Sequence, residues 1–209
     1  MKKWAILFLF LFGITSGINN ISSAVWADEH EMPSAFVKYC RDIYLKINDK
    51  DLGYECFSTA LSGYQNLINE MDEINQGFLT IIDFSKPSTA ERFFVVDLVN
   101  QKVLFKSLVS HGQKSGDNYA TTFSNRMQSH MSSLGFYLTG ESYFGKHGYS
   151  MKLYGLENEF NSNAYKRAVV VHAANYVTYD YINKNGRIGR SFGCPALPPD
   201  VNEEIINEE

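Results

Sequence analysis

The chain has 209 residues, enough for one domain with a hydrophobic core, or for one domain with a small helical attachment. Apolar residues make up 44% of it and charged residues 20%, which is the composition of a globular protein and excludes a disordered one. The formal charge is −4 and no cluster of Lys and Arg is present, so we exclude nucleic-acid binding, which depends on neutralising phosphates.

The N-terminus has the three-part pattern of a secretory signal peptide. Lys2 and Lys3 precede an apolar run, Trp4–Ile14, and a polar stretch then leads to Ala24-Val25-Trp26-Ala27. The run is about 11 residues long, whereas a membrane span needs about 20. We therefore predict a signal peptide at 1–27, cut after Ala27 or, as second choice, after Ala24; a retained anchor is the alternative. The mature chain is expected in the periplasm or cell envelope without a stable membrane anchor.

Residues 28–76 are expected to form a helical hairpin. Apolar side chains recur at three- and four-residue steps on one face of a first helix: Phe36, Val37, Cys40, Ile43, Tyr44 and Ile47. Asp51-Leu52-Gly53 interrupts the pattern, and a second amphipathic helix follows from about Tyr54 to Glu70. Two short helices hold little core, so the hairpin must pack on something else.

After Gly77 the apolar pattern changes to short runs rich in β-branched and aromatic residues. The expected strands are Phe78–Phe84, Arg92–Leu98, Val103–Ser110, Leu134–Leu138, Ser150–Tyr154 and Ala168–His172. Gly-rich segments at Gly112–Gly116 and Gly140–Gly148 are expected to be loops. This spacing predicts a mainly β domain over residues 77–209, a mostly antiparallel β-sandwich or barrel, which ends in a charged helical piece at Val201–Glu209.

The three cysteines are Cys40, Cys56 and Cys194. In an oxidising compartment an odd number suggests one disulfide and one free thiol. Cys40 and Cys56 lie 16 residues apart in the hairpin and are the natural pair; two unpaired buried thiols are the alternative. In both cases Cys194 remains free, and a free thiol in an exported protein needs a reason.

The segment around Cys194 carries the features of a nucleophile. Its sequence is Arg187-Ile188-Gly189-Arg190-Ser191-Phe192-Gly193-Cys194-Pro195. A thiol reacts as the thiolate, which the positive charges of Arg187 and Arg190 would favour. Gly193 lets the backbone approach a ligand and leaves the Cys194 amide, with a neighbouring amide, to face an oxyanion. Ser191 adds a hydroxyl.

A cysteine nucleophile needs a base, and His172 is the candidate. It ends the apolar run Ala168–Val171, so a strand would hold its ring rigidly beside a loop. A buried, hydrogen-bonded structural histidine is the alternative, but the Gly-Cys pair downstream favours a catalytic one.

The pattern His172…Ser191-Phe192-Gly193-Cys194 resembles the His…Ser-x-Gly-Cys signature of L,D-transpeptidase (YkuD-like) catalytic domains. Further strings resemble the murein branch of that family: SHGQKSG (110–116), FSN (123–125), SSLGFYLTGESYFGKHGYS (132–150), LYGLE (153–157), VVHAANYV (170–177) and GRSFGCPAL (189–197). The similarity runs over about residues 77–200.

The resemblance implies a β-sandwich enzyme acting on peptidoglycan stem peptides, donor and acceptor. Cys194 would attack the amide before a terminal D-Ala, His172 would relay the proton, and amides at Gly193 and Cys194 would hold the oxyanion. A backbone carbonyl would orient the histidine, and Ser191 would order the histidine or the cysteine loop. A carbapenem adduct on Cys194 is a further expectation.

The sequence departs from the family pattern at two places. Many members carry Arg two residues after the cysteine, where this chain has Ala196. Arg190 or Arg187 is the hypothesised replacement. Related domains also usually continue into one more strand that closes the sheet.

Other residues are candidates for the substrate groove. His111, Tyr143, His147, Tyr149 and Arg190 are predicted to bind substrate, although packing is the alternative for each tyrosine and an ordinary loop role for each histidine. Ser132-Ser133 is expected to act as a local cap. We expect no cofactor and no metal, because no close His-x-x-x-His or Cys-x-x-Cys spacing supports zinc. An L,D-carboxypeptidase and a non-catalytic murein-binding domain are the alternative functions.

Overall fold

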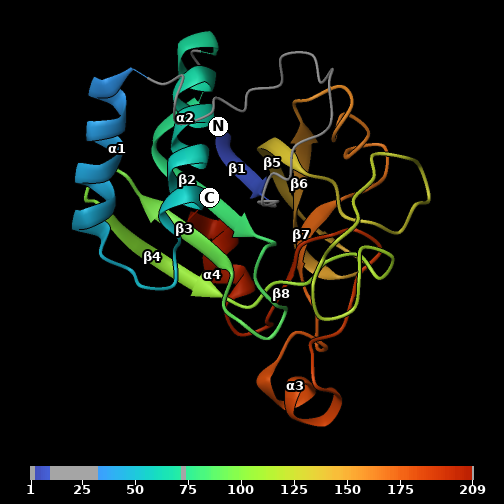
Figure 1. The fold of residues 1–209 in the computed structure, drawn as a ribbon. Helices are drawn as coiled ribbons and strands as arrows, with labels where there is room; N and C mark the ends of the chain where they lie inside the picture. Colours follow the sequence, from blue (N-terminus) through green and yellow to red (C-terminus); the bar gives the residue numbers. More distant parts are fainter. Residues whose placement is uncertain (1–2, 10–32, 72–73, 209) are drawn as a thin grey trace, which may run out of the picture.

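The computed structural model describes residues 3–9, 33–71 and 74–208. The elements along the chain are β1 (Lys3–Leu9), α1 (Ser34–Ile47), α2 (Tyr54–Glu70), β2 (Ile74–Asp83), β3 (Phe93–Asp97), β4 (Lys102–Ser107), β5 (Gly135–Gly145), β6 (Gly148–Gly155), β7 (Val170–Ala173), α3 (Tyr179–Asn185), β8 (Ala196–Leu197) and α4 (Asn202–Glu208). Figure 1 shows α1 and α2 side by side against the strands, with α3 standing apart from them.

The two expected N-terminal helices are confirmed. The apolar face of α1 buries Cys40, Ile43 and Ile47, and the helix ends at Asn48 in the left-handed conformation (φ 48°). Along α2 the apolar side is buried from Cys56 to Tyr64. Both helices contribute to one buried cluster with the sheet, so the hairpin shares its core with the strands.

The strands form one eight-stranded sheet in the order β4-β3-β2-β1-β5-β6-β7-β8. Neighbours are antiparallel except β1 with β2 and β7 with β8, which are parallel. The predicted predominance of antiparallel pairing is therefore confirmed. The segment Gly140–Gly148, expected to be a loop, is instead a hairpin: β5 continues to Gly145 and pairs with β6 through Gly148, with an irregularity between Thr139 and Ser142.

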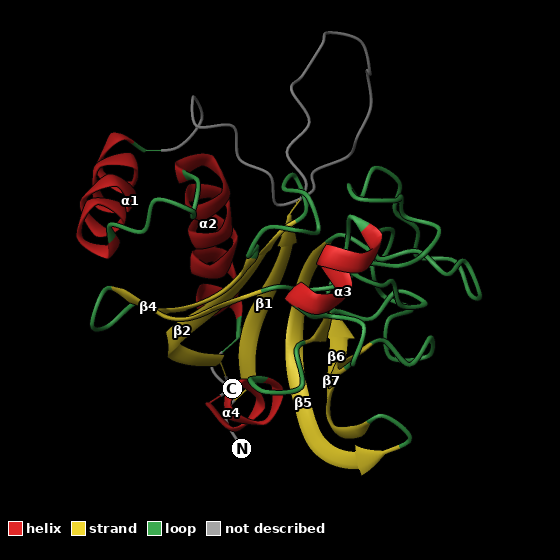
Figure 2. Cartoon of the chain, turned by 90° about the horizontal axis from the view of Figure 1, so that it is seen from below, coloured by secondary structure: helices red, strands yellow, loops and turns green. Residues whose placement is uncertain are grey.

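Alternating side chains give the sheet two apolar faces, each covered by a different layer. Leu79, Ile81, Phe94 and Val96 belong to the cluster that α1 and α2 cover. Their neighbours in sequence, including Ile82, Phe93 and Val95, belong to a second cluster with β5–β8 and with α4. Figure 2 shows α1 and α2 on one side of the strands and α4 apart from them.

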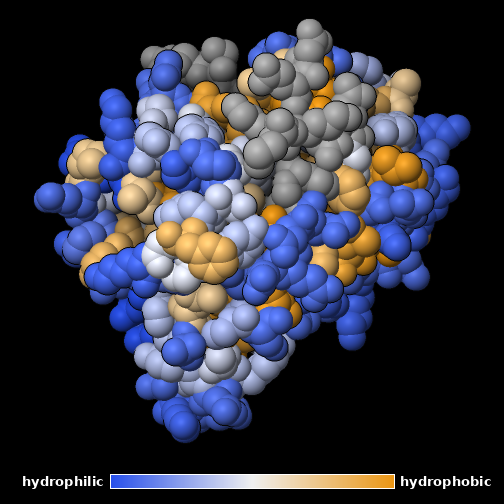
Figure 3. Space-filling view, turned by 180° about the vertical axis from the view of Figure 1, so that it is seen from behind, coloured by the Kyte–Doolittle hydropathy of each residue, from blue (hydrophilic) through white to orange (hydrophobic). Residues whose placement is uncertain are grey.

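The expectation of a mainly β chain is corrected, because helices account for a share of the fold comparable to the strands. Helices α1 and α2 supply one wall of the core, α4 contributes Ile205 and Ile206 to the other cluster, and α3 was not expected. The helical piece expected near the end of the chain is confirmed as α4. Hydrophilic side chains dominate the rear surface, with apolar residues in small groups between them (Figure 3).

Part of the predicted signal peptide forms β1. Its backbone pairs with β2 from Lys3 to Leu9 and with β5 from Ala5 to Phe8, which places it inside the sheet. The proposed cleavage positions, Ala24 and Ala27, lie outside the described residues. Within the described part of the chain, no helix has the length and apolarity that crossing a membrane requires.

Cys40 and Cys56 are both buried thiols that are not joined by a disulfide in the structure. Each belongs to the cluster between the helices and the sheet. Of the two alternatives that the sequence left open, the structure has two buried thiols with no disulfide between them. Burial raises the pKa of the Cys56 thiol well above its ordinary value, so this thiol is protonated and unreactive at neutral pH.

Candidate active site

Cys194 lies in a tight loop that leads into β8. Gly193, the residue before it, has φ +127°, a conformation that residues with a side chain rarely adopt. A Cβ atom there would lie 2.6 Å from the carbonyl oxygen of Met131, so glycine is required by space as well. Ser191 closes the loop: its hydroxyl accepts a hydrogen bond from the Gly193 amide (3.0 Å) and donates one to the Cys194 carbonyl (2.6 Å).

Two further buried serines tie this loop to other segments. Ser110 Oγ donates to the Cys194 carbonyl (3.2 Å) and accepts from the Ala196 amide (3.1 Å). Ser132 Oγ donates to the Gly193 carbonyl (3.2 Å) and accepts from the Gly112 amide (3.0 Å). The expected local capping role of Ser132 is therefore wrong, because its side chain joins two segments far apart in the sequence.

The Cys194 thiol is half-buried and donates to the carbonyl of Ala168 at 3.5 Å. Ala168 has φ 55°, in the left-handed region, so its carbonyl lies in an unusual stretch of backbone just before β7. Burial raises the pKa of the Cys194 thiol, while the amide of Val170 and the positive charge of Arg167 lower it. The balance favours the protonated thiol, so a nucleophilic role would require a base to take its proton.

His172 lies on β7, and its register partner on β8 is Ala196, two residues after Cys194. Its Nδ1 lies 2.9 Å from the carbonyl oxygen of Ala173. A carbonyl only accepts hydrogen bonds, so Nδ1 carries the proton and Nε2 keeps its lone pair. This is the orientation by a backbone carbonyl that the family resemblance implied.

The surroundings of His172 keep it neutral. The ring is buried, and the ring of His147 is stacked on it at a centroid distance of 4.5 Å and an angle of 28°. Burial lowers the pKa of His172; the hydrogen bond to Ala173 raises it, and His147 lowers it further. A neutral imidazole with one nitrogen free, on the strand that pairs with the segment just after Cys194, has the protonation state that a general base for a cysteine needs.

The amides around the cysteine do not all face a ligand. The Gly193 amide is used by Ser191 and cannot hold an oxyanion in this state, which corrects its expected role. Within the part of the chain that the structure describes, no acceptor is found for the amide of Cys194. One of the two expected amides therefore remains available.

A family model described as the L,D-transpeptidase catalytic domain matches residues 48–208. The chain belongs to this family. Comparisons with curated proteins and with solved structures find no match. The residues matched run from the connection between α1 and α2 to the end of α4, so the L,D-transpeptidase domain includes α2, the whole Cys194 loop and β7 with His172. Peptidoglycan is the substrate that the family implies.

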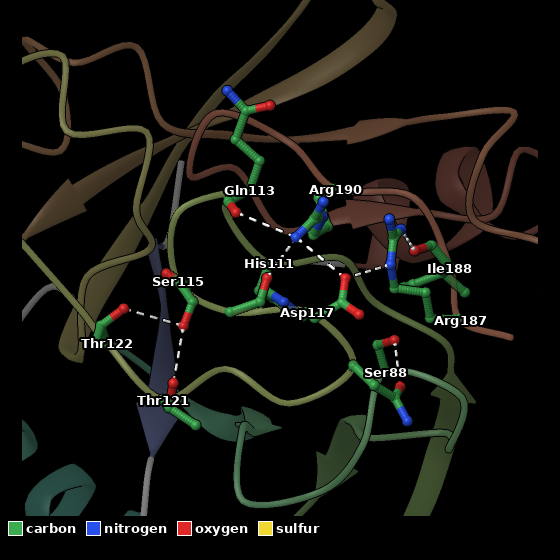
Figure 4. Close-up of polar contacts among 12 residues, drawn as sticks. Ser88, His111, Gln113, Ser115, Asp117, Thr121, Thr122, Arg187, Ile188 and Arg190 are labelled. Carbon is green, nitrogen blue, oxygen red and sulfur yellow. Dashed lines mark hydrogen bonds and ion pairs between the residues drawn. The ribbon is translucent and has the colours of Figure 1, made fainter. Parts of the chain in front are cut away.

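In this L,D-transpeptidase domain Arg190 and Arg187 hold a neighbouring loop. Arg190 Nη1 donates to the carbonyl of Gly116 (2.8 Å) and lies 3.3 Å from the Asp117 carboxylate; Arg187 Nε lies 2.7 Å from the same carboxylate. Figure 4 shows both guanidinium groups converging on Asp117. Arg187 and Arg190 are thus both ion-paired with Asp117. Neither is the cation that lowers the pKa of Cys194.

His111 does not line a groove. It is fully buried, and its Nδ1 accepts a hydrogen bond from Arg92 at 2.8 Å. Its Nε2 is buried without a hydrogen-bond partner among the described residues. Burial first, and then the charge of Arg92, lower the pKa of His111 to about 3. The predicted substrate contact of His111 is therefore wrong, and its role is structural. The neighbouring glycines suggested an exposed loop, whereas His111 is packed inside the protein.

The other three substrate candidates divide between the two faces of the sheet. Tyr143 lines a cavity of about 240 Å³ beside the segment that precedes His172, together with Lys152, Tyr165, Ala168, Val169 and Val170. His147 contacts His172. Tyr149 precedes Ser150, the register partner of His172, and so lies on the opposite face, where its hydroxyl donates to Asn207 on α4. The predicted substrate contact of Tyr149 is therefore not supported.

Arg167 is the functional candidate that the sequence pattern did not single out. It lies in the turn segment before β7, and its contacts are with residues 124–133, which are far away in the sequence. The only available signal was its position five residues before His172, next to an apolar run. Among the described residues, no group of three or more His, Cys, Asp or Glu side chains is placed to hold a metal ion.

Proposed function

We propose that this chain is a cysteine-dependent L,D-transpeptidase that acts on peptidoglycan tetrapeptide stems in the periplasm or cell envelope. Cys194 is the nucleophile and His172 the general base. The substrate is the amide between the diamino acid of the donor stem and its terminal D-Ala. The acceptor is an amine of a neighbouring stem.

In the first half-reaction the thiol proton of Cys194 passes to Nε2 of His172 as sulfur attacks the carbonyl carbon. The Cys194 amide faces the developing oxyanion. When the tetrahedral intermediate collapses, the carbon–nitrogen bond breaks, His172 returns the proton to the leaving nitrogen, and D-Ala departs as the free amine. The donor stem remains on Cys194 as a thioester.

In the second half-reaction the acceptor amine attacks the thioester carbon and loses a proton to His172. The carbon–sulfur bond breaks, the proton returns to sulfur, and a new amide joins two stems. If water takes the place of the amine, the product is a shortened stem with a free carboxylate, which is the L,D-carboxypeptidase reaction.

One observation carries the proposal beyond family membership: the hydrogen bond between His172 Nδ1 and the Ala173 carbonyl. It fixes the tautomer that a base requires, on the strand that pairs with the segment directly after the Cys194 loop. A histidine that serves only packing does not need an Nε2 lone pair that is left without a hydrogen bond while Nδ1 is bonded to a carbonyl. This observation supports a catalytic domain over a non-catalytic murein-binding one.

The test is incubation of the purified chain with a disaccharide-tetrapeptide, followed by mass spectrometry. We expect loss of D-Ala together with a cross-linked dimer. Loss of D-Ala alone indicates carboxypeptidation. Cys194→Ala should abolish both products, while Cys40→Ala, which removes a thiol from the helical core, should keep them. A folded wild-type chain that leaves the substrate unchanged would contradict both enzymatic functions.

A carbapenem provides a second readout, based on the family resemblance. We expect a covalent adduct on the peptide that contains Cys194 and none on those with Cys40 or Cys56, since these two thiols are buried. An adduct that persists in Cys194→Ala would contradict the assignment of the nucleophile.

A further inference from the structure

Arg167 lies against the nucleophile loop. A Cβ atom built on Gly193 would be 3.0 Å from Arg167 Nη2, so the guanidinium lies on the open side of the residue directly before Cys194. The absence of a side chain at Gly193 is what permits this approach. The charge of Arg167 is close enough to influence the Cys194 thiol, and the thiol influences the guanidinium in return.

The guanidinium is fixed in place by neutral oxygen atoms. Nη1 donates to the carbonyl of Ser124 (2.8 Å) and to Ser133 Oγ (2.5 Å), and Nη2 donates to Ser129 Oγ (3.1 Å) and to the carbonyl of Met131. Four such bonds hold the planar group rigidly.

Within the described residues, Arg167 makes no ion pair with an acid. Among the described residues, the ion pairs of arginine involve Arg187 and Arg190, and none involves Arg167. The guanidinium is half-buried, and burial lowers its pKa, which means that its charge lacks full solvation. Two ionisable groups interact with this cation, Tyr137 and then Cys194. Burial raises the pKa of Tyr137, so its hydroxyl stays protonated, and the thiol of Cys194 is the group of the two that can supply a stabilising anion.

We propose that Arg167 is the cation that stabilises the thiolate of Cys194, in the place that the family pattern gives to an arginine after the cysteine. Here that later position is Ala196, and Arg187 and Arg190 are paired with Asp117. The inference rests on Cys194 being the nucleophile of the proposed function. Arg167 acts through the sulfur and through the backbone of Gly193; we assign it no contact with substrate.

The experiment measures ionisation of the thiol without any substrate. The rate at which iodoacetamide alkylates Cys194 is followed by peptide mass spectrometry between pH 6 and pH 10.5. Three variants are compared with wild type: Arg167→Met removes the charge, Arg167→Lys keeps it, and Lys166→Met removes an exposed charge one residue away.

Arg167→Met is expected to raise the midpoint of this titration by about 1 pH unit, the lower end of what an adjacent opposite charge produces. A midpoint 1 unit higher lowers the fraction of thiolate at pH 7 about tenfold. The more basic thiolate is also a better nucleophile, so the alkylation rate at pH 7 should fall only about threefold. Arg167→Lys should keep the midpoint within about 0.3 of wild type, and Lys166→Met should leave it unchanged.

Both Arg167 variants lose hydrogen bonds, so their melting temperatures should fall by similar amounts. The thiol titration then distinguishes the loss of the positive charge from the loss of packing. Equal midpoints for Arg167→Met and wild type, or equal shifts in the Met and Lys variants, would overturn the proposal. If Arg167→Met does not fold, Arg167→Gln, which keeps two donors, is judged by the same criterion. If the wild type does not release D-Ala, the proposed function is contradicted but the role of Arg167 is not, because the thiol titration uses no stem peptide.

Discussion

At the scale of single residues, His172 and His111 are both buried but differ in whether Nδ1 donates or accepts its hydrogen bond. Both rings are buried, and burial is the largest cause that lowers the pKa of each. His172 turns one nitrogen to a carbonyl and leaves the other with a free lone pair, as the proposed base requires. In His111 the nitrogen that accepts is used by Arg92, and the remaining N–H is buried without a partner among the described residues. The same residue type thus leaves a nitrogen available for the proposed chemistry in one place and serves packing in the other.

The depressed pKa of His111 predicts a loss of stability in acid. The ring is neutral in the folded chain down to about pH 3 and takes up a proton near pH 6.5 when unfolded. The unfolded state therefore binds one more proton in this window, and the free energy of unfolding falls as pH decreases from about 6.5 to 3, by up to about 1.4 kcal/mol per pH unit. Below that window this contribution no longer changes.

Urea unfolding across that pH range measures the effect, with His111→Gln as the comparison. The amide can still accept from Arg92 but does not titrate, so the variant should be less stable at pH 7 and show a shallower decline in acid. A variant with the same slope as wild type would assign the acid sensitivity to other groups.

At the scale of elements, the site depends on a loop that several segments hold together. Ser132, just before β5, joins the carbonyl of Gly193 to the amide of Gly112. Ser132→Ala leaves both backbone groups without their buried partner, at a cost of about 1–3 kcal/mol. We expect a lower melting temperature and, because the Gly193 backbone before Cys194 is then held less firmly, a fall in turnover of more than tenfold.

Thr122→Val is the matched control for that substitution. Its hydroxyl also donates to backbone carbonyls of the 110–117 segment, but it is exposed and makes no contact with the Cys194 loop. A small change in stability with normal turnover is expected. Equal losses of turnover in the two variants would show that the Ser132 contact has no special role.

The sequence could predict features that depend on residues close together in the chain, and it could not predict those that depend on residues far apart. The helices follow from local periodicity, and the proposal of Cys194 and His172 as nucleophile and base follows from a short motif. Arg167 could not be found in this way, because every oxygen that fixes it comes from residues 124–133. His111 was misplaced for the same reason: its burial depends on Arg92, nineteen residues earlier, which a local pattern of glycines does not encode.

At the scale of the whole molecule, β1 raises a conflict between the fold and the predicted export. The segment Lys3–Leu9 pairs with β2 on one side and β5 on the other, so it links the half of the sheet under α1 and α2 to the half that carries β7 and β8. Cleavage after Ala27, as the sequence predicts, would remove this strand. One molecule cannot have both features.

The two forms of the chain therefore should differ in stability. Without residues 1–27 the facing edges of β2 and β5 lose their hydrogen-bond partners, and unpaired strand edges are costly when buried and prone to pairing with other chains when exposed. We expect residues 28–209 to melt at least about 5 °C below residues 1–209 and to associate more readily, as measured by thermal unfolding and light scattering. Determining the N-terminus of the protein recovered from cells shows whether residues 1–27 are retained there. Equal melting temperatures would mean that β1 contributes nothing to holding the two halves of the sheet together.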